Sequence, residues 1–410
     1  MNRISRREFL RGSAASIATL ALAGAMGGVA SADDTTITIW VADNMVDLTT
    51  EYATAYLEEN YPDFTIDVQA VGEGDAASNM ITDVEGGADI YTFAQDQKAR
   101  LVSAGALSEL SDYYAEWVAE NNDAGSVAAV QNGEATYAFP ITSDNGYFLY
   151  YDSSVVTDPT SVEAILADCE AAGKGFYFQI SGGWYNVAMF FGTGCTLTYE
   201  ADESGTYTNC TIDYASDAGV TAMKALISVA SSSAFYDGSS IGDATNCAAI
   251  VDGTWDSTAA QELFGENYAC TKLPTFTVDD VTYQMNSFGG YKMLGVKPQT
   301  DENKALACFD LAQYLADAEV QLARFEAEGW GPSNLTAQAD EAVQENEALT
   351  ALAEQSEFAI PQGDYPDDYW TVSEALGKDI IAGTYNDYTD EQLLEVLTDF
   401  QAQCEAAVTG

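Results

Sequence analysis

A serine motif of the kind found in hydrolases, together with the absence of histidine, limits the chemistry that this chain can perform. Residues 238–242 read Gly-Ser-Ser-Ile-Gly and match the G-x-S-x-G spacing of a hydrolase nucleophile. The 410 residues contain no histidine, so no Ser-His-Asp triad can form. The commonest general base near neutral pH and the commonest zinc ligand are missing for the same reason. We interpret the motif as a polar loop.

Carboxylates are the other candidates for catalysis. The chain has 65 Asp and Glu residues, so some pair will lie at the separation used by glycosidases whatever the protein does. No metal-ligand spacing, phosphate loop or dinucleotide fingerprint occurs in the sequence. Residues 202–207 resemble a calcium loop superficially but lack its alternating ligands and closing glutamate. We expect no catalytic residue, no metal and no cofactor.

Aromatic residues are better placed for binding. Several lie where predicted strands or helices meet loops: Phe93, Trp184, Tyr185, Trp255 and Trp370. Aromatic rings cover the CH faces of sugar rings, while nearby carboxylates and amides accept hydrogen bonds from hydroxyl groups. The alternative is that these large side chains fill the core or a seam between domains.

The first residues are typical of an export signal. Residues 5–11 read Ser-Arg-Arg-Glu-Phe-Leu-Arg, a twin-arginine motif, and an apolar stretch follows at about 17–29. Ala30-Ser31-Ala32 fits a cleavage site, and the apolar stretch is too short for a transmembrane anchor. We therefore expect export by the twin-arginine route, a mature chain that begins near Asp33, and a periplasmic, extracellular or cell-surface location. No lipobox cysteine is present, because the first cysteine is Cys169.

The charge excludes several classes of partner. With 14 basic and 65 acidic residues, the net charge is −51. Binding to nucleic acid or to anionic lipid depends on Lys and Arg, so both roles are excluded, and anionic substrates are disfavoured as well. Such acidity can also reflect adaptation to high salt. Seven cysteines, and an excess of lysine over arginine after the leader, favour an ordinary secreted bacterial protein instead.

The seven cysteines suggest two bridges. Cys195 and Cys210 flank a turn-rich stretch and could join the arms of a hairpin, and Cys247 with Cys270 is a second plausible pair. Each bridge would add about 3 kcal/mol of stability. Cys308 lies in an apolar helical stretch, where we expect a buried free thiol.

Apolar periodicity predicts alternating strands and helices early in the mature chain. Strands are expected at 35–41, 64–71 and 88–93, and helices at 47–60, 75–84 and 96–104, the last one capped by Asp96. This order is typical of a doubly wound α/β sheet, in which ligands bind where strands end and helices begin. Later segments continue the pattern, with strands at 175–180 and 248–251 and helices at 219–230, 303–317, 318–328, 341–355, 371–382 and 390–408. The length suggests two domains.

Four stretches, in order along the mature chain, carry a resemblance to a known family. Residues 87–96 (GADIYTFAQD) followed by 103–107 (SAGAL) resemble a G-P-D-I … D-R … G-x-L segment. Residues 139–152 resemble Y-P-x-x-x-E-x-x-x-L-x-Y-N, and 248–255 (AAIVDGTW), with LPTF at 273–276 downstream, resemble A-M-x-x-x-G-x-W. Ile-Pro-Gln at 360–362 followed by Trp370 resembles an aromatic C-terminal segment. Together they resemble the maltose/maltodextrin-binding branch of bacterial solute-binding proteins, the extracytoplasmic receptors of ABC importers.

The resemblance implies a periplasmic-binding-protein-like α/β fold, with two lobes joined by a hinge, ligand in the cleft between them, and closure on binding. It places crossing segments at 142–145, near 287–290 and near 330–334. The implied division is a leader at 1–32, an N-terminal lobe of 33–142 plus 288–333, and a C-terminal lobe of 143–287 plus 334–410.

The resemblance also implies site residues. Stacking positions fall on Phe93, Trp184, Tyr185, Trp255 and Trp370. Polar contacts to the sugar fall on Asp43, Asn44, Asp96, Gln97 and Asp144.

The chain departs from the family pattern at three of these places. The family often has Lys after its first-strand Asp and Arg after the Asp of its D-R motif, where this chain has Asn44-Met45 and Asp96-Gln97. Both cations are therefore lost, and Asp144 is one methylene shorter than the usual Glu. These changes bear on which sugar is bound rather than on the class of protein.

The function implied is that of a monomeric, non-catalytic receptor. It would capture an oligosaccharide, an α-glucan of the maltose/maltodextrin type, and deliver it to the membrane subunits of an ABC permease. One alternative is a secreted carbohydrate-active enzyme that uses a pair of carboxylates. The other is a receptor of the same fold for another solute, such as a peptide or a polyamine.

Overall fold

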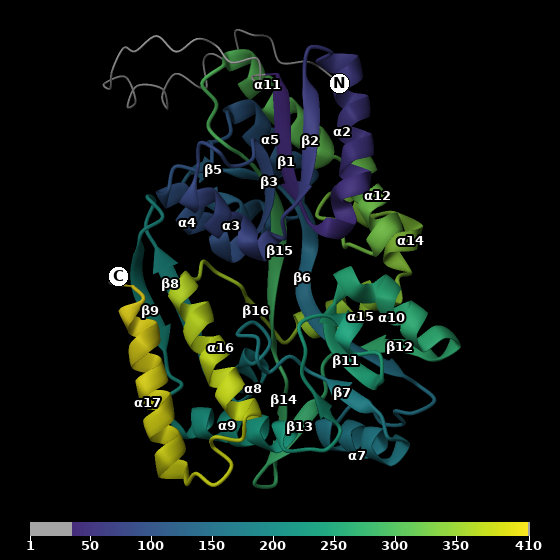
Figure 1. The fold of residues 1–410 in the computed structure, drawn as a ribbon, viewed down its shortest axis with the longest axis vertical. Coiled ribbons are helices and arrows are strands. Elements are labelled where there is room, and N and C mark those ends of the chain that lie inside the picture. Colours follow the sequence, from purple (N-terminus) through teal and green to yellow (C-terminus); the bar gives the residue numbers. More distant parts are fainter. Residues whose placement is uncertain (1–34, 409–410) are drawn as a thin grey trace.

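The computed structural model describes residues 35–408, and over these residues a ten-stranded sheet runs through both halves of the molecule (Figure 1). Its order is β10-β7-β11-β6-β15-β3-β1-β2, with β12 paired to β6 and β16 paired to β15. The predicted leader and cleavage site lie outside the described residues. The strands of this sheet are β1 (Thr36–Val41), β2 (Thr65–Ala70), β3 (Ile90–Ala94), β6 (Ala138–Asp152), β7 (Gly175–Tyr177), β10 (Phe235–Tyr236), β11 (Cys247–Gly253), β12 (Tyr268–Thr271), β15 (Ser287–Val296) and β16 (Ala359–Pro361).

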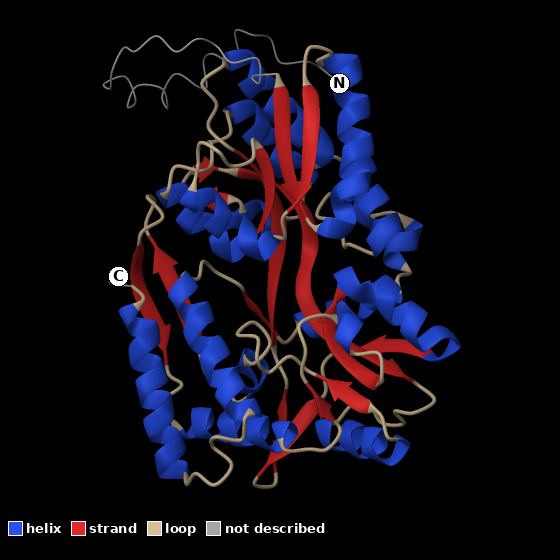
Figure 2. Cartoon of the chain, in the orientation of Figure 1, coloured by secondary structure: helices blue, strands red, loops and turns tan. Residues whose placement is uncertain are grey.

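The first half contains the parallel strands β1, β2 and β3 with helices packed around them (Figures 1 and 2). The predicted alternation of strands and helices is confirmed here, with each element within two residues of its expected bounds. The last of the predicted helices, α4, starts at Lys98 after a short 3-10 turn, η4 (Gln95–Gln97). No side chain caps it, so the predicted capping role of Asp96 is wrong. The helices of this half are α2 (Val46–Asn60), α3 (Glu73–Thr82), α4 (Lys98–Ser103), α5 (Asp112–Asn121), α6 (Ala124–Ala129), α11 (Glu302–Leu315) and α12 (Ala318–Glu328).

Two long antiparallel strands, β6 and β15, connect the halves (Figure 1). At one end β15 pairs with β3, and at the other end β6 pairs with β11 and β12. Where they cross, Gly146 is opposite Gly289 and Asn145 is opposite Gly290, and the register becomes irregular between Gly290 and Lys292. A third segment joins them there, since the Ser143 amide donates to the carbonyl of Gly331 at 3.0 Å. The three crossings thus meet at one place.

The second half surrounds the other end of the sheet. Its additional hairpins are β8 (Leu197–Ala201) with β9 (Tyr207–Ile212), and β13 (Thr275–Val278) with β14 (Val281–Gln284). A small hairpin of the first half pairs β4 (Gln131–Asn132) with β5 (Ala135–Thr136). The helices of the second half are α7 (Val162–Ala172), α8 (Val187–Gly192), α9 (Asp217–Ala230), α10 (Ser257–Phe264), α15 (Glu347–Ser356), α16 (Asp367–Ile381) and α17 (Asp390–Ala406). The short helices α13 (Leu335–Gln338) and α14 (Glu341–Gln344) lie beside α12 of the first half (Figure 1).

The described residues bury apolar side chains in separate cores. One core takes its residues from 37–141 and 293–330, and a second takes them from 147–288 and 365–404, with a small third cluster beside the second. The first core therefore combines chain segments that are about 150 residues apart in sequence. These cores support the predicted lobe division, whose boundaries stay a prediction.

One predicted helix differs from the structure. The stretch 341–355 forms two helices, α14 and α15, rather than one. The Asn346 side chain accepts a hydrogen bond from the Leu349 amide at 3.0 Å, which caps a new helix and ends the previous one. Among the helices described, none has the length and apolar character needed to cross a membrane.

The predicted disulfides are not present, because all seven cysteines are free thiols. Cys210 pairs with Tyr199 in the β8–β9 hairpin, whereas the Cys195 end lies near Asp213. The two cysteines are thus several residues out of register, and each residue adds about 3.3 Å along the strand. Their sulfur atoms are too far apart for a disulfide.

The second pair is separated in another way. Cys247 and Cys270 lie on β11 and β12, and residues of both strands pair with Tyr151 of β6. The strand β6 therefore lies between β11 and β12. Since neighbouring strands are about 4.8 Å apart, the two cysteines are on strands that are not adjacent and cannot be bridged. Cys308 is a buried free thiol, as predicted.

Candidate functional site

Aromatic side chains from distant parts of the chain meet beside the crossing strands. The ring centroids of Trp184 and Trp255 are 5.8 Å apart, Trp184 lies 6.4 Å from Phe288, and Phe288 lies 6.3 Å from Trp370. We call the following set the aromatic cluster: Tyr147, Trp184, Tyr185, Trp255, Phe288, Tyr365 and Trp370. The structure thus brings together four of the five aromatic residues that the sequence singled out.

Each member of the aromatic cluster is held by a defined element. Tyr147 and Phe288 lie on β6 and β15, Trp255 is in a 3-10 turn after β11, η6 (Thr254–Asp256), and Trp370 is in the first part of α16. Trp184 and Tyr185 follow β7 in the loop that leads into α8. A Cβ atom at Gly183 would lie 3.4 Å from the Trp370 ring and 2.9 Å from Ser373, so this approach needs glycine. The rings therefore gather where strands of the second half end.

Solvent exposure distinguishes aromatic rings that can contact a ligand from rings that only pack in the core. Tyr147 and Phe288 are fully buried, whereas Trp184, Tyr185, Trp255 and Trp370 are half-buried. Half-buried rings keep part of a face available to a ligand, and the buried rings support them from behind. The half-buried members are the ones predicted to stack on sugar.

Phe93 does not join this cluster. Its side chain is fully buried in the first core, with its ring 5.7 Å from that of Tyr91. Both faces of β3 are buried, so a residue at the end of this strand packs internally. The structure assigns Phe93 a packing role rather than the predicted stacking role.

Asp96 and Gln97 lie next to the aromatic cluster. The Asp96 carbonyl accepts a hydrogen bond from the Tyr365 amide at 3.1 Å, and its side chain is 5% exposed. Burial raises the pKa of Asp96 to about 7, against the lowering effect of Arg100. The Gln97 amide donates to the carbonyl of Gly74 at 3.1 Å. A carboxyl group with this pKa can donate or accept a hydrogen bond near neutral pH.

A group of amide side chains, not identified from the sequence, faces the same place. The Asn145 amide donates to Gln362 Oε1 at 3.2 Å. A Cβ atom at Gly290 would lie 3.1 Å from Gln362 Oε1 and 3.4 Å from Gln95 Oε1, so these amides converge over that glycine. Gln95 Oε1 is a buried oxygen without a hydrogen-bond partner in the described part of the chain. Donors from a bound molecule would satisfy it.

Lys292 supplies a cation that the motif comparison did not reveal. It is 7% exposed, and its ammonium lies 4.0 Å from the Trp330 ring centroid and 4.8 Å from that of Trp255. These are cation–π distances. A lysine inside the otherwise apolar end of β15 is the sequence signal that could have found it.

A buried carboxyl group, that of Asp252, supports Tyr185, and partly buried Asp256 lies beside it. The Tyr185 hydroxyl donates to Asp252 Oδ1 at 3.0 Å. Burial raises the pKa of Asp252 well above its ordinary value, and neighbouring Asp256 raises it further. Burial also raises the pKa of Asp256. Burial and the nearby Asp256 thus both disfavour the charged form of Asp252, the hydrogen-bond partner of the Tyr185 hydroxyl.

Three predicted polar contacts lie elsewhere. Asp43 and Asn44 are exposed in the 3-10 turn η3 (Asp43–Met45) after β1. Asp144 is 2% exposed and accepts hydrogen bonds from the Gly331 amide at 2.5 Å and from the Thr254 hydroxyl. Its neighbours Asn145 and Tyr147 point to the amide group and the aromatic cluster. Asp144 therefore contacts Thr254 and Gly331 rather than the amide group.

The two halves also touch beside the aromatic cluster. The Ala99 amide donates to Asp364 Oδ1 at 3.0 Å, Lys98 Nζ lies 3.8 Å from Asp364 Oδ2, and Arg100 pairs with Asp367. Asp364 and Asp367 precede Trp370 in the chain. These contacts join α4 of the first half to the segment that presents Trp370.

The tip of the β8–β9 hairpin makes further contacts across the halves. The Asn132 amide donates to the Glu203 carbonyl at 2.8 Å. A Cβ atom at Gly205, where φ is +78°, would lie 1.9 Å from the carbonyl oxygen of Ala99. The hairpin therefore packs backbone to backbone on α4. These contacts hold the two halves against each other beside the aromatic cluster.

Comparison with known families identifies the class. The family described as "Bacterial extracellular solute-binding protein" matches residues 51–351, which is more than half of the chain. The chain belongs to this family. Its members bind solutes, so the protein is a binding protein and not an enzyme.

One curated relative matches part of the chain. The galactooligosaccharide-binding protein of Bacillus subtilis (strain 168) is 31% identical over 138 residues, which cover 33% of this chain and 31% of that protein. The match thus spans about a third of the length of the relative.

Solved structures match almost the whole chain. A structure with acarbose has 25% identity and a TM-score of 0.79, and the match covers 91% of this chain and 99% of that one. The maltodextrin binding protein MalE1 from L. casei BL23 without ligand has 21% identity, a TM-score of 0.73 and coverage of 92% and 100%. The Thermus thermophilus maltotriose binding protein bound with maltotriose has 17% identity, a TM-score of 0.74 and coverage of 91% and 100%. These likenesses confirm the predicted periplasmic-binding-protein-like fold.

Proposed function

We propose that this protein is the extracytoplasmic receptor of an ABC sugar importer and that it binds maltodextrin-type oligosaccharides between its two lobes. The observation that carries the proposal is the aromatic cluster, in which Trp184, Tyr185, Trp255 and Trp370 lie half-buried beside the crossing strands. Rings in this arrangement suit a chain of sugar rings, whose CH faces pack on aromatic faces.

The polar groups around the aromatic cluster suit a neutral ligand rich in hydroxyl groups. Gln95, Asn145 and Gln362 provide amide donors and acceptors, and Asp96 can exchange a proton near neutral pH. Lys292 lies over Trp255 and Trp330 and leaves little cationic charge free for an anionic ligand. The site thus offers stacking and hydrogen bonds rather than charge pairing.

The relatives support the same ligand class. Structures similar to this chain were solved with acarbose or maltotriose, and the curated relative is a galactooligosaccharide-binding protein. We carry from them the class of ligand, an oligosaccharide. We choose maltodextrin because a maltodextrin-binding and a maltotriose-binding protein are among the matches that cover more than nine-tenths of the chain.

The proposal includes the lobes, the partner and the location. The N-terminal lobe is 33–142 plus 288–333 and the C-terminal lobe is 143–287 plus 334–410, and the separate cores support this division. Ligand binding closes the lobes about the crossing segments, and the closed protein delivers its ligand to the permease subunits. Export through the twin-arginine leader places the monomeric receptor outside the cytoplasm.

Intrinsic tryptophan fluorescence tests the proposal. Four of the six tryptophans belong to the aromatic cluster or lie against Lys292 beside it, so ligand binding should change the emission. We expect saturable changes with maltotriose and longer maltodextrins and none with cellobiose or spermidine. The Trp370→Ala variant should bind about 2 kcal/mol more weakly, which is about 30-fold in Kd.

Trp117→Ala is the matched control. Trp117 lies on α5 against Phe139 of the first core, so the same side chain is removed away from the site. This variant should keep the affinity of the original protein. A response to spermidine alone would replace the sugar with a polyamine, and equal loss of affinity in both variants would contradict the assigned site.

A further inference from the structure

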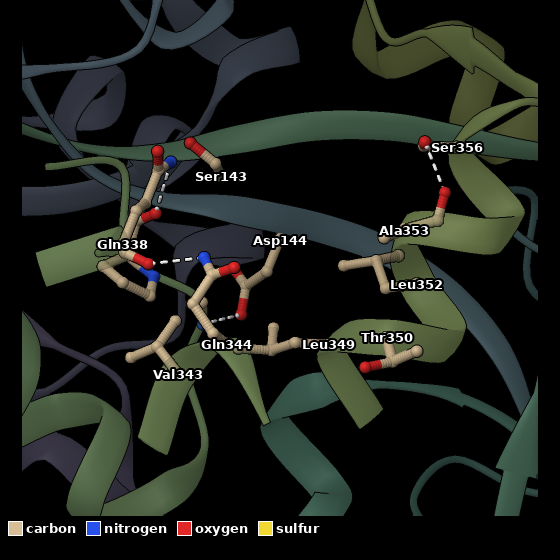
Figure 3. A pocket seen from close by; sticks show the side chains of 12 residues that line it. Ser143, Asp144, Gln338, Val343, Gln344, Leu349, Thr350, Leu352, Ala353 and Ser356 are labelled. Atoms are coloured by element: carbon tan, nitrogen blue, oxygen red, sulfur yellow. Dashed lines mark hydrogen bonds between the residues drawn. The ribbon is translucent and has the colours of Figure 1, made fainter. Parts of the chain in front are cut away.

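A cavity lies away from the aromatic cluster, at the place where the crossing segments meet (Figure 3). Its volume is about 390 Å³, which falls in the range of small-molecule sites. The walls come from β6, the segment at 331–332 and the helices α13, α14 and α15. No member of the aromatic cluster lines it.

The two sites are on opposite faces of β6. Successive side chains of a strand point to opposite sides. Tyr147 packs against Trp184, whereas a Cβ atom at Gly146 would lie 2.9 Å from Leu352, a residue that lines the cavity. Asp144 lines the cavity together with Leu352, and Figure 3 shows its side chain among these residues.

Asp144 is the polar group that the cavity leaves unsatisfied. One carboxylate oxygen, Oδ2, accepts from the Gly331 amide and the Thr254 hydroxyl. The other, Oδ1, is buried and has no hydrogen-bond partner among the described residues. Within 35–408 no Lys or Arg forms an ion pair with this side chain. Buried carboxylates are normally paired, so Oδ1 marks a position for a cationic donor.

The other residues that line the cavity indicate the chemistry of the rest of the ligand. Val343, Leu349 and Leu352 form an apolar side of the cavity, while Gln338 and Gln344 add amides (Figure 3). The Gln344 amide is already bonded to the Gln338 carbonyl at 2.7 Å. The cavity therefore combines one free carboxylate oxygen with a short aliphatic surface.

We propose that this cavity is a second ligand site, which binds a small aliphatic amine. Its ammonium group donates to Asp144 Oδ1, and its alkyl part packs on Val343, Leu349 and Leu352. The site is separate from the proposed sugar site and does not depend on it. It gives Asp144 a ligand other than the sugar that the family resemblance assigns to this residue.

Calorimetric titration of the purified protein at 0.15 M salt tests the proposal. The probe is isopentylamine, and isopentanol is the neutral analogue of the same shape. We expect one amine per chain and binding of the alcohol at least 10-fold weaker. Asp144→Asn, which removes the charge at constant size, should weaken amine binding at least 10-fold, and Leu349→Phe, which fills the cavity, should abolish it.

Two controls separate this site from general attraction to an acidic protein. Glu345→Gln removes an exposed carboxylate beside α14 and should leave amine binding unchanged. Trp370→Ala, which acts on the other face of β6, should also leave it unchanged even though it weakens sugar binding. Thermal melts show whether each variant is folded, and a melt of Leu349→Phe with and without amine gives a second readout. Equal binding of amine and alcohol, or equal effects of Asp144→Asn and Glu345→Gln, would overturn the proposal.

Discussion

Asp96 is a buried carboxyl group whose protonation changes within the physiological range of pH. Burial raises its pKa from 3.8 to about 7, and Asp364 and Asp367 add to the effect while Arg100 opposes it. The native protein therefore holds a proton that the unfolded chain releases above about pH 4. The stabilisation from this group is complete below that pH and is lost as the pH rises through about 7.

The Asp96→Asn variant tests this linkage. The difference between a pKa of 3.8 in the unfolded chain and about 7 in the native protein corresponds to a loss of about 4 kcal/mol in the free energy of unfolding as the pH rises across that range. Urea unfolding at several values between pH 5 and 8 should show the original protein losing stability with rising pH relative to the variant. Since Asp252, Asp256 and Asp364 titrate in both proteins, the difference isolates Asp96. Parallel stability curves would show that Asp96 is not protonated in the native state.

Part of the candidate site could be predicted, because some of its residues can be recognised from the sequence directly around them. Trp184, Trp255 and Trp370 follow glycine or aspartate stretches that end apolar segments, and this context places them at a ligand-facing edge. Phe93 has a similar context, but β3 is buried on both faces. Asn145 and Gln362 have no local signal, because they meet only through the register of β6 with β15 and of β15 with β16.

At the scale of elements, the β8–β9 hairpin extends from the second half to α4 of the first. Its tip depends on Gly205, which has a positive φ and no room for a Cβ atom beside Ala99. The hairpin itself was expected from its turn-rich sequence. Its contact with α4 could not be, since no periodic pattern relates residues about 100 positions apart.

The Gly205→Ala variant should weaken ligand binding, because it disrupts a contact between the halves that the proposed closure on ligand would use. Gly194, with φ of +92° and open space around its missing Cβ atom, is the matched control in the same half. Both changes should cost about 1 kcal/mol or more of stability from backbone strain. Only Gly205→Ala should lower the affinity measured by fluorescence titration, and equal affinities for the two variants would contradict the role of the hairpin.

The regular elements could be predicted more fully than their breaks. The strands and helices of the first half have clear periodic patterns, and the structure reproduces them. The break between α14 and α15 depends on a single capping residue, Asn346, inside a continuous helical pattern. The disulfide hypothesis failed because it relied on sequence spacing, whereas bridging depends on strand register.

At the scale of the whole molecule, the charge of −51 acts on stability as well as on the choice of ligand. Carboxylates spread over the surface repel one another in the compact state and less in the expanded chain. Salt shortens the range of this repulsion, from about 10 Å at 0.1 M to about 3 Å at 1 M. The folded state should therefore gain stability as salt is added.

Thermal melts between 0.1 M and 1 M NaCl measure this effect, and we expect Tm to rise by several degrees. Exposed residues such as Glu58, Glu59 and Glu395 offer a control, since each change to Lys reduces the net charge by two units. A variant with all three changes should show a smaller rise. The same rise in both proteins would assign the effect to ion exclusion rather than to charge repulsion.

The order of pairing in the sheet determines when the first half can fold. Strand β3 has its place beside β15, and β15 ends at Val296, about 200 residues further along the chain. At about 5–20 residues per second, the ribosome needs about 15–60 s to reach that strand. Until then the edge of β3 that faces away from β1 has no partner strand. Pairings between strands so far apart in sequence form slowly. The protein therefore completes its fold only after most of the chain has been synthesised. This order of events suits the proposed export by the twin-arginine route, which carries folded proteins.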